Sequence, residues 1–317
     1  GTDLWTVAVI AGLVAGGIGE AEILQCVLCF GAQRLLAGHQ VAGRYFVRRE
    51  HERGRPEEHA ASAAVSEERS GAQATQLEKA IELLRNAGIV VLPGSGFDVV
   101  PTDCLAAQLK RELPGADSLV LAFEAGGGPS PGTAKTSVEG LGKGGRARID
   151  GKMTRVPLAW KTRTFERDGE QRFAMTIPWG DVYTAWVSTG IGNVEVYMGV
   201  PPGTATKLRR LRLLGPLLGL GPVQALLKKQ VEKRVRGPSD ATRGKTGCVV
   251  WGEARDAAGH EVKRRLRTPN GYEITVTAAL GIVARLLDGP APKGGYYTPS
   301  ALMGADYVLS LPGVSLD

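Results

Sequence analysis

The sequence is poor in the residues that mark secreted, metal-bound or membrane-spanning proteins. Its 317 residues include four cysteines and four histidines. Four cysteines in a chain of this length predict no disulfide framework, so we expect a reducing, cytoplasmic environment. The apolar run at residues 7–18 is shorter than the roughly 20 residues that cross a bilayer. No basic region precedes it, as one would in a secretory signal. The pattern favours a cytoplasmic protein that is at most peripheral to a membrane.

Hydrophobic residues and glycine, by contrast, are plentiful. Hydrophobic residues make up 43% of the chain and charged residues 22%, which is enough apolar material for a packed core and excludes a wholly disordered chain. The 44 glycines are about twice the usual share and follow no collagen-like period. They predict turns and loops at which a ligand approaches the backbone closely.

The positive charge is concentrated in one segment. The net charge is +7, and residues 207–236 contain nine lysines and arginines against one acid, Glu232. The rest of the chain is close to neutral, so no nucleic-acid-binding surface is expected. Leucines fill the centre of this segment, and two interpretations remain open. The segment either lies on anionic lipid or grips an acyl substrate, or it forms core-packed helices whose basic residues face water, which the pattern favours.

Residues 1–75 differ in composition from the rest of the chain. They show poor periodicity, apart from a strand-like start at residues 5–10 and a helix at residues 20–30. Cys26 and Cys29 lie in an apolar run without a second pair of ligands, so we interpret them as buried thiols. The histidines of this region lie in polar sequence and are expected at the surface; they are His39, His51 and His59.

From residue 76 the pattern alternates helices and buried strands. Apolar residues at helical spacing over residues 77–86 end at Gly88, which predicts a glycine stop. The apolar run 89–92 predicts a strand buried on both faces, as in a parallel sheet. This order of helix, strand, loop, helix and strand is typical of a doubly wound sheet. The loop covers residues 93–100, the next helix begins at Pro101, and the next strand covers residues 118–124.

The second half of the chain is expected to be richer in strands. Ser130 and Pro131 form the pattern of a capped helix start, and Asp150-Gly151 predicts a hairpin turn. The expected strands cover residues 146–150, 153–156, 172–177, 182–188 and 194–199, and a second hairpin covers residues 247–267. The helices of the basic segment are expected to break at Gly215-Pro216 and Gly221-Pro222. One later helix covers residues 272–287, and the last begins at Thr298-Pro299.

The most informative stretch runs from Leu92 to Asp103. A buried strand ends in two glycines and is followed by an acidic residue and two prolines in the loop before a helix. Ligands of open α/β sheets bind outside the carboxyl ends of strands, where glycine admits close approach and helix N-termini attract anions. A tight strand–helix turn without a ligand is the alternative, and spacing alone does not decide between the two.

Four groups of unusual residues follow one another along residues 89–317. They are residues 94–103 (Gly-Ser-Gly-Phe-Asp-Val-Val-Pro-Thr-Asp), residues 126–136 (Gly-Gly-Gly-Pro-Ser-Pro-Gly-Thr-Ala-Lys-Thr), residues 177–181 (Ile-Pro-Trp-Gly-Asp), and residues 295–306 with Gly-Tyr-Tyr-Thr-Pro-Ser and Gly-Ala-Asp. Together they resemble the saccharopine dehydrogenase-like (saccharopine reductase-like) family of NAD(P)-binding oxidoreductases, whose signature is G-x-G-F-D-x-V-P-[ST]-D.

The resemblance implies an α/β protein in which a Rossmann-like nucleotide-binding unit joins an α+β domain with a mostly antiparallel mixed sheet. It implies hydride transfer between NADP or NAD and a C=N, C=O or C=C bond. Some members resemble trans-acting enoyl reductases of lipid synthesis. A small-molecule or acyl substrate, a second copy of the chain and an anionic membrane surface are the expected partners.

The resemblance also assigns candidate site residues. Asp98 and Lys135 are the candidates for catalytic groups, and no metal site is expected. The cofactor-binding candidates are Gly94, Gly96, Phe97, Asp98 and Pro101, and the candidates for the substrate cleft are Asp103, Gly132, Thr133, Thr136, Trp179 and Asp181.

The glycine fingerprint of such nucleotide-binding units is not matched. Gly17-Ile-Gly19-Glu-Ala-Glu22 places an acid where close helix–strand packing requires a third glycine, and Glu22 would repel a pyrophosphate. We therefore expect a truncated or frameshifted N-terminus and weak or no binding of NAD(P)H. A non-catalytic lipid-surface or scaffold protein that has lost its cofactor is the alternative function.

The expected organisation has four parts. Residues 1–75 are an atypical region, and residues 76–125 are the end of the Rossmann-like unit. Residues 126–290 form an α+β substrate and dimerisation domain that contains the basic helical segment 204–236. Residues 291–317 return to the Rossmann-like unit.

Overall fold

The computed structural model of the chain describes residues 8–10, 81–82, 84–86 and 88–317. The expected glycine-rich turn with Glu22, the Cys26 and Cys29 pair, the three N-terminal histidines and the helix at residues 20–30 lie outside these residues. The helix expected at residues 77–86 lies partly inside them, and its described residues are helical. Gly88 has φ 65° and donates its N–H to the Arg85 carbonyl at 3.2 Å, which confirms the glycine stop.

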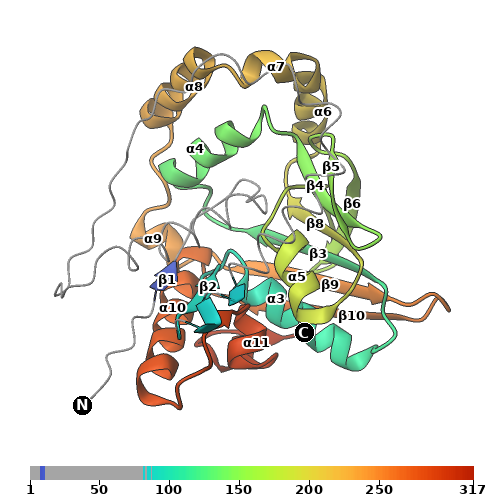
Figure 1. Ribbon diagram of the computed structural model, residues 1–317. Helices are drawn as coiled ribbons and strands as arrows, with labels where there is room; N and C mark the ends of the chain where they lie inside the picture. Colours follow the sequence, from blue (N-terminus) through green and yellow to red (C-terminus); the bar gives the residue numbers. More distant parts are fainter. Residues whose placement is uncertain (1–7, 11–80, 83, 87) are drawn as a thin grey trace.

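Strand β2 is the centre of a small parallel sheet. It covers Val90–Pro93 and pairs in parallel with β1 (Ala8–Ile10) and with β11 (Gly295–Tyr296). Residues 90–92 are buried, so the expected buried parallel strand is confirmed. The sheet thus joins segments from both ends of the chain (Figure 1).

In the described part of the chain, nine strands form a second sheet that is mixed and mostly antiparallel. The parallel pair in it is β3 (Ser118–Ala125) with β8 (Asn193–Gly199). The strand order is β12-β10-β9-β3-β8-β4-β5, and the β6–β7 hairpin pairs with β8 through β7. The other strands are β4 (Gly145–Ile149), β5 (Lys152–Val156), β6 (Thr162–Arg167), β7 (Glu170–Thr176), β9 (Cys248–Arg255), β10 (Glu261–Thr268) and β12 (Ser315–Leu316). The expected fold class, α/β with a mostly antiparallel mixed sheet, is confirmed.

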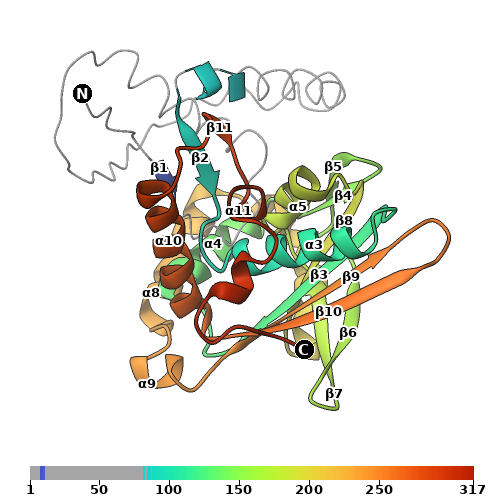
Figure 2. The ribbon, with the colours of Figure 1, turned by 90° about the horizontal axis from the view of Figure 1, so that it is seen from below.

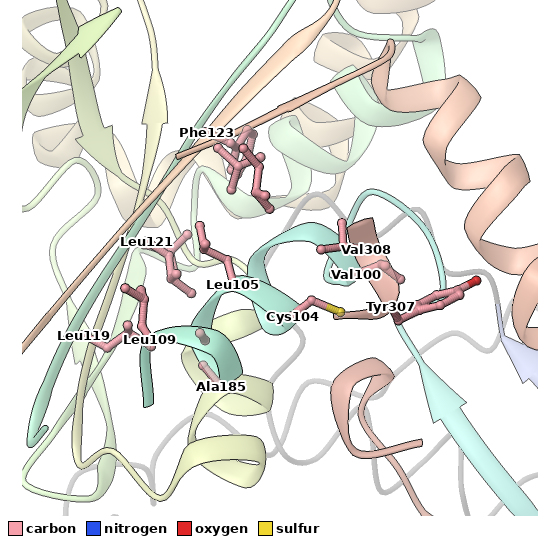
Figure 3. Packing of buried hydrophobic residues seen from close by; sticks show 14 of the residues in the cluster. Val100, Cys104, Leu105, Leu109, Leu119, Leu121, Phe123, Ala185, Tyr307 and Val308 are labelled. Atoms are coloured by element: carbon pink, nitrogen blue, oxygen red, sulfur yellow. The ribbon is translucent and has the colours of Figure 1, made fainter. Parts of the chain in front are cut away.

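Helix α3 (Val100–Glu112) lies across one face of the large sheet and carries the core. Leu105 and Leu109 of α3 pack with Leu119 and Leu121 of β3, and all four are almost completely buried (Figure 3). Their burial removes most of their apolar surface from water and is the main stabilising contribution at this interface.

The alternation of side chains along β9 explains why α3 lies so close to the sheet. Trp251 points to the opposite face, where its ring stacks on Phe165 at 5.5 Å between centroids. Gly252 points toward α3, and a Cβ there would come within 2.6 Å of Leu109 Cδ1. Glycine therefore sets the distance between helix and sheet.

Three further helices complete the covering of this face. Helix α5 (Asp181–Thr189) packs beside α3, as does α11 (Pro299–Met303). Helix α10 (Gly271–Asp288) lies on the other side of β2 from α3 in Figure 2 and contributes Ile274, Ala278 and Ile282 to the core. The short η2 (Tyr307–Ser310) is tied to α10 because the Tyr307 hydroxyl donates to the Ala278 carbonyl at 2.7 Å.

The remaining helices form an arch on one side of the molecule, far from α3 (Figure 1). Helix α4 lies against α8, and α8 has no buried residue. Leucines of the arch such as Leu213, Leu217 and Leu226 are exposed, whereas Leu218 is buried, so the preferred interpretation of core-packed leucines is wrong for most of the segment. The arch consists of α4 (Pro131–Gly140), α6 (Pro202–Leu211), η1 (Arg212–Leu214), α7 (Gly215–Leu218) and α8 (Gly221–Arg234), and α9 (Asp240–Arg243) follows it.

One expected strand is a helix. Residues 182–188 alternate β-branched and aromatic residues, which favours a strand, yet they belong to α5. Asp181 in the first turn and Gly190, with φ 70° at the C-cap, delimit the helix, and burial of one side against α3 outweighs the strand preference. The other expected strands, hairpins and helices of residues 89–317 are confirmed, and β6 was not expected. Among the described residues, no helix is both long enough and apolar enough to span a membrane.

Candidate functional site

The loop after β2 is held in a strained, closely packed conformation. Gly94 has φ 75°, and a Cβ there would lie 2.6 Å from Val99 Cγ2. Val99 itself has φ 154° and ψ −43° at the start of α3, in a region that a β-branched residue rarely adopts. Strained backbone of this kind persists only where neighbouring contacts fix it, and it occurs often at ligand sites.

The first turn of α10 supplies those contacts. The Phe97 N–H donates to Thr275 Oγ1 at 3.0 Å, and Thr275 Oγ1 in turn donates to the Gly271 carbonyl at 2.7 Å. A Cβ at Gly96 would lie 2.7 Å from Thr275 Cγ2. The loop backbone therefore lies directly on α10, and Gly96 is required for that contact.

Residues 126–136, the second segment of the family signature, also contact the first turn of α10. The Asn270 side-chain amide donates to the Gly126 carbonyl at 3.2 Å, and the Ser130 N–H donates to the Tyr272 hydroxyl at 2.6 Å. Asn270 also caps α10, because its Oδ1 accepts from the Tyr272 N–H at 3.1 Å. One helix start thus joins the loop after β2 to the loop after β3.

Three aromatic rings connect these loops to residues 177–181, the third segment of the family signature. Phe97 meets Phe123 edge-on with 5.5 Å between centroids, and Phe123 lies 4.6 Å from Trp179. Trp179 is half-buried, and its Nε1 is a buried donor with no hydrogen-bond partner in the described structure. Because an unsatisfied buried donor is costly, this nitrogen is a natural contact for a ligand acceptor.

Asp181 lies beneath the loop as a completely buried carboxyl group. Thr102 Oγ1 lies 2.7 Å from Asp181 Oδ2 and 3.1 Å from the Val99 carbonyl, and a hydroxyl has only one hydrogen to give. Complete burial raises the pKa of Asp181 well above its ordinary value, and the charge of Asp103 raises it further. The Thr102 hydroxyl is thus shared between the Asp181 carboxyl and the carbonyl of the strained Val99, and the raised pKa of Asp181 favours the protonated carboxyl at this contact.

Asp103 connects three helices. Its Oδ1 accepts from the Ser188 hydroxyl of α5 at 2.5 Å, and its Oδ2 accepts from the Ser300 N–H of α11 at 2.7 Å. Burial raises the pKa of Asp103, although the hydrogen bonds from Ser188 and Ser300 oppose the shift. Both oxygens are bonded within the protein, so the structure gives this expected cleft residue an internal, positioning role.

The candidates on α4 lie next to this junction or point away from it. Ser130 caps α4, because its Oγ accepts from the Thr133 N–H at 3.2 Å. Thr136 Oγ1 donates to the Gly132 carbonyl at 3.1 Å. Lys135 pairs with Glu232 of α8 at 2.6 Å. Its ammonium is therefore engaged between helices.

The structure thus brings together most, but not all, of the expected site residues. Phe97, Asp98 and Trp179 are half-buried, and Phe97 contacts the start of α10 through Thr275, whereas Pro101 is buried in α3. Sequence reasoning missed Asn270, Tyr272 and Thr275, because a polar helix start gives no signal of what it touches. It also missed Ser95 Oγ and the Tyr296 hydroxyl, which are buried without a hydrogen-bond partner in the described structure. The described ranges contain no group of three metal-ligating side chains.

No protein-family profile and no curated protein sequence matches this chain. Among solved structures, it is similar to apo histidine-tagged saccharopine dehydrogenase (L-Glu forming) from Saccharomyces cerevisiae, with a TM-score of 0.49, 12% identity and 76% of each chain covered. A dehydrogenase from Chromobacterium violaceum has a TM-score of 0.20 and 10% identity, over 62% of this chain and 45% of that one. An oxidoreductase from Bacillus cereus has a TM-score of 0.22 and 11% identity, over 69% of this chain and 64% of that one. At these values no activity is argued from the similarity.

Proposed function

We propose that the chain is an NAD(P)-dependent oxidoreductase of the saccharopine dehydrogenase-like kind. It transfers a hydride between the nicotinamide cofactor and a C=N, C=O or C=C bond of a small-molecule or acyl substrate. The observation that carries the proposal is the convergence of two signature segments on the first turn of α10, with a third joined to them through the rings of Phe123 and Trp179. Segments that are far apart in the sequence and meet around half-buried polar and aromatic side chains are typical of a ligand site.

The residues around this junction fit one end of a nicotinamide dinucleotide. The unpartnered Trp179 Nε1 suits the carboxamide oxygen of the nicotinamide, and the rings of Phe97 and Phe123 beside it suit a flat heterocycle. Bound there, the reduced cofactor supplies the hydride.

The protein's own part is to position the ligands and to handle a proton. Asp98 is half-buried on the loop and is the carboxyl group we assign to exchange a proton with the substrate nitrogen or oxygen. Phe97 and Trp179 exclude water from the reacting carbon. The buried Asp181 fixes the loop from below through Thr102 and Val99.

Titration of the full chain with NADPH, followed by nicotinamide fluorescence, tests the proposal. We expect saturable binding that is weaker than low micromolar, because the glycine fingerprint is not matched. Trp179→Phe keeps the ring but removes the donor, and should weaken binding about fivefold, the value of one hydrogen bond of about 1 kcal/mol. Trp160→Phe is the matched control, since Trp160 lies between β5 and β6 and contacts Lys161; it should leave binding unchanged.

A non-catalytic protein without cofactor is the second candidate function. One observation favours it: the spaces beside Gly94 and Gly96 are filled by Val99 and Thr275, so both glycines serve internal packing. No saturable binding of NADPH or NADH to the folded chain would support this candidate and overturn the first. A dissociation constant in the low micromolar range would instead contradict our interpretation of Glu22 as an obstacle to the pyrophosphate.

A further inference from the structure

The outer side of the helical arch is an apolar and basic surface. We define it by α6, η1, α7 and α8, which follow the edge of the molecule farthest from α3 (Figure 1). Leu213 is 87% exposed and Leu226 is 60% exposed. Side chains of this size are normally buried in a soluble protein when they occur in clusters. Three more leucines share this exposure: Leu214, Leu217 and Leu220.

The basic residues of the arch fall into two groups. Those of the first group hold the arch to the rest of the protein. Arg212 donates to the carbonyls of Leu158 and Ala159 at 2.6 and 2.7 Å, and Lys228 pairs with Glu139 of α4 at 2.5 Å. The second group is exposed and makes no ion pair in the described part of the chain; it consists of Lys207, Arg210, Lys229, Lys233, Arg234 and Arg236.

Apolar and basic residues share one side of α8. Leu226, Lys229, Gln230 and Lys233 are all exposed and follow each other at helical spacing, so they form one stripe. The other side of α8 is occupied by α4, because Gln224 Nε2 donates to the Val138 carbonyl at 3.0 Å and Glu232 pairs with Lys135. The stripe therefore faces away from the protein.

We propose that this surface docks on an anionic lipid bilayer, with the leucines inserted among the lipids and the second group of basic residues on the headgroups. The charge decides the choice of occupant. A second copy of the chain would bring two strongly basic surfaces together, and like charges at close range oppose such an interface. A lipid surface supplies both an apolar interior and a negative layer at the right depth.

The test is co-sedimentation of the full chain with two kinds of vesicle, phosphatidylcholine alone and phosphatidylcholine mixed with phosphatidylserine. We expect binding to the anionic vesicles only. Salt should weaken this binding, because it screens the basic residues, but part of it should persist because inserted leucines are not screened.

Two double variants separate the contributions. Lys229→Glu with Lys233→Glu should weaken anionic binding at least about 30-fold, since each lysine at an anionic surface contributes about 1 kcal/mol. The matched control is Lys245→Glu with Lys293→Glu, which makes the same change at exposed lysines outside the arch and should have a much smaller effect. Leu213→Ser with Leu217→Ser should remove the salt-resistant part.

All four residues of the two arch variants are exposed, so unchanged thermal unfolding is expected and any loss of binding reports on the surface itself. Equal binding to neutral vesicles, no binding to either kind, or equal losses in the arch and control variants would overturn the proposal. A different result would also overturn it: the wild type does not bind anionic vesicles but sediments as a dimer, and Leu213→Ser with Leu217→Ser dissociates that dimer. The surface would then be occupied by a second copy of the chain.

Discussion

At the residue scale, the molecule depends on buried carboxyl groups that are stabilised in different ways. Asp103 is bonded at both oxygens by groups from α5 and α11, whereas complete burial raises the pKa of Asp181 and favours its protonated form, which avoids the cost of a buried charge. The charge of Asp103 is one of the causes that raise the pKa of Asp181. Together the two carboxyl groups fix the start of α3 and hence the loop before it.

The proton on Asp181 makes stability depend on pH. A pKa raised in the folded state contributes stability that is fully present below the unfolded-state pKa and is lost as pH rises through the folded-state pKa. Asp181→Asn places a permanent donor beside Thr102. We expect the melting temperature of the variant to exceed that of the wild type by the least at the lowest pH and by more as pH rises, about 2–4 °C for each kcal/mol. Melting curves from about pH 5 to about pH 9 would check this, and a difference that does not change with pH would contradict it.

Gly96 should tolerate no side chain. Gly96→Val would place methyl groups against Thr275 and break the bond from the Phe97 N–H, so we expect a loss of about 1–3 kcal/mol in unfolding free energy and impaired ligand binding. Gly203→Val is the control, since a Cβ at Gly203 meets no atom within 4 Å. Gly96→Ala should cost less in a Thr275→Ala background than in the wild type, because the clashing atoms are gone.

At the element scale, the outcome of sequence reasoning depended on whether local pattern or distant contact decides the structure. β2 and the hairpin at Asp150-Gly151 were predictable, because a run of consecutive apolar residues indicates a strand buried on both faces and a pair of consecutive turn residues indicates a hairpin. α5 was not, since its side chains favour a strand and its packing against α3 comes from elsewhere in the chain. The exposure of Leu213 was missed for the same reason. Among the site residues, the signature loops were found, and the start of α10 that joins them was not.

The pairing of α4 with α8 predicts that Lys135 stabilises the protein through its ion pair with Glu232. Lys135→Glu places a second acid next to Glu232. It should lower the melting temperature only slightly, because an exposed ion pair contributes at most about 1 kcal/mol. Lys135→Glu with Glu232→Lys restores opposite charges and should recover the wild-type value. If Lys135 were a catalytic group, the exchanged pair would recover stability while substrate turnover stayed lost, which a turnover assay would reveal.

At the scale of the whole molecule, the last residues complete the first sheet. β11 pairs with β2, the start of α11 holds Asp103, and Val308 of η2 lies in the core. Between these points, the large sheet also depends on pairings between distant strands, such as β3 with β8 and with β9. The fold is therefore completed only when the C-terminal residues contact β2, Asp103 and the core.

Removal of residues 291–317 should prevent folding. The shortened chain would expose one edge of β2, leave Asp103 without the Ser300 N–H, and lose the buried Val308. We expect no cooperative thermal unfolding by circular dichroism. Removal of residues 313–317 alone takes away mainly exposed groups at β12 and should retain a cooperative, slightly lower transition. Cooperative unfolding of the longer deletion would contradict this account.

The position of β11 also has a consequence for synthesis on the ribosome. β2 emerges early but gains its second neighbour only when the end of the chain has been made, and the bond from Ser300 to Asp103 spans 197 residues. During that interval β2 presents an open, apolar edge, which is the kind of surface that recruits chaperones or pairs with another nascent chain. The yield of this protein in a cell should therefore be sensitive to translation speed and chaperone supply, even if the finished fold is stable.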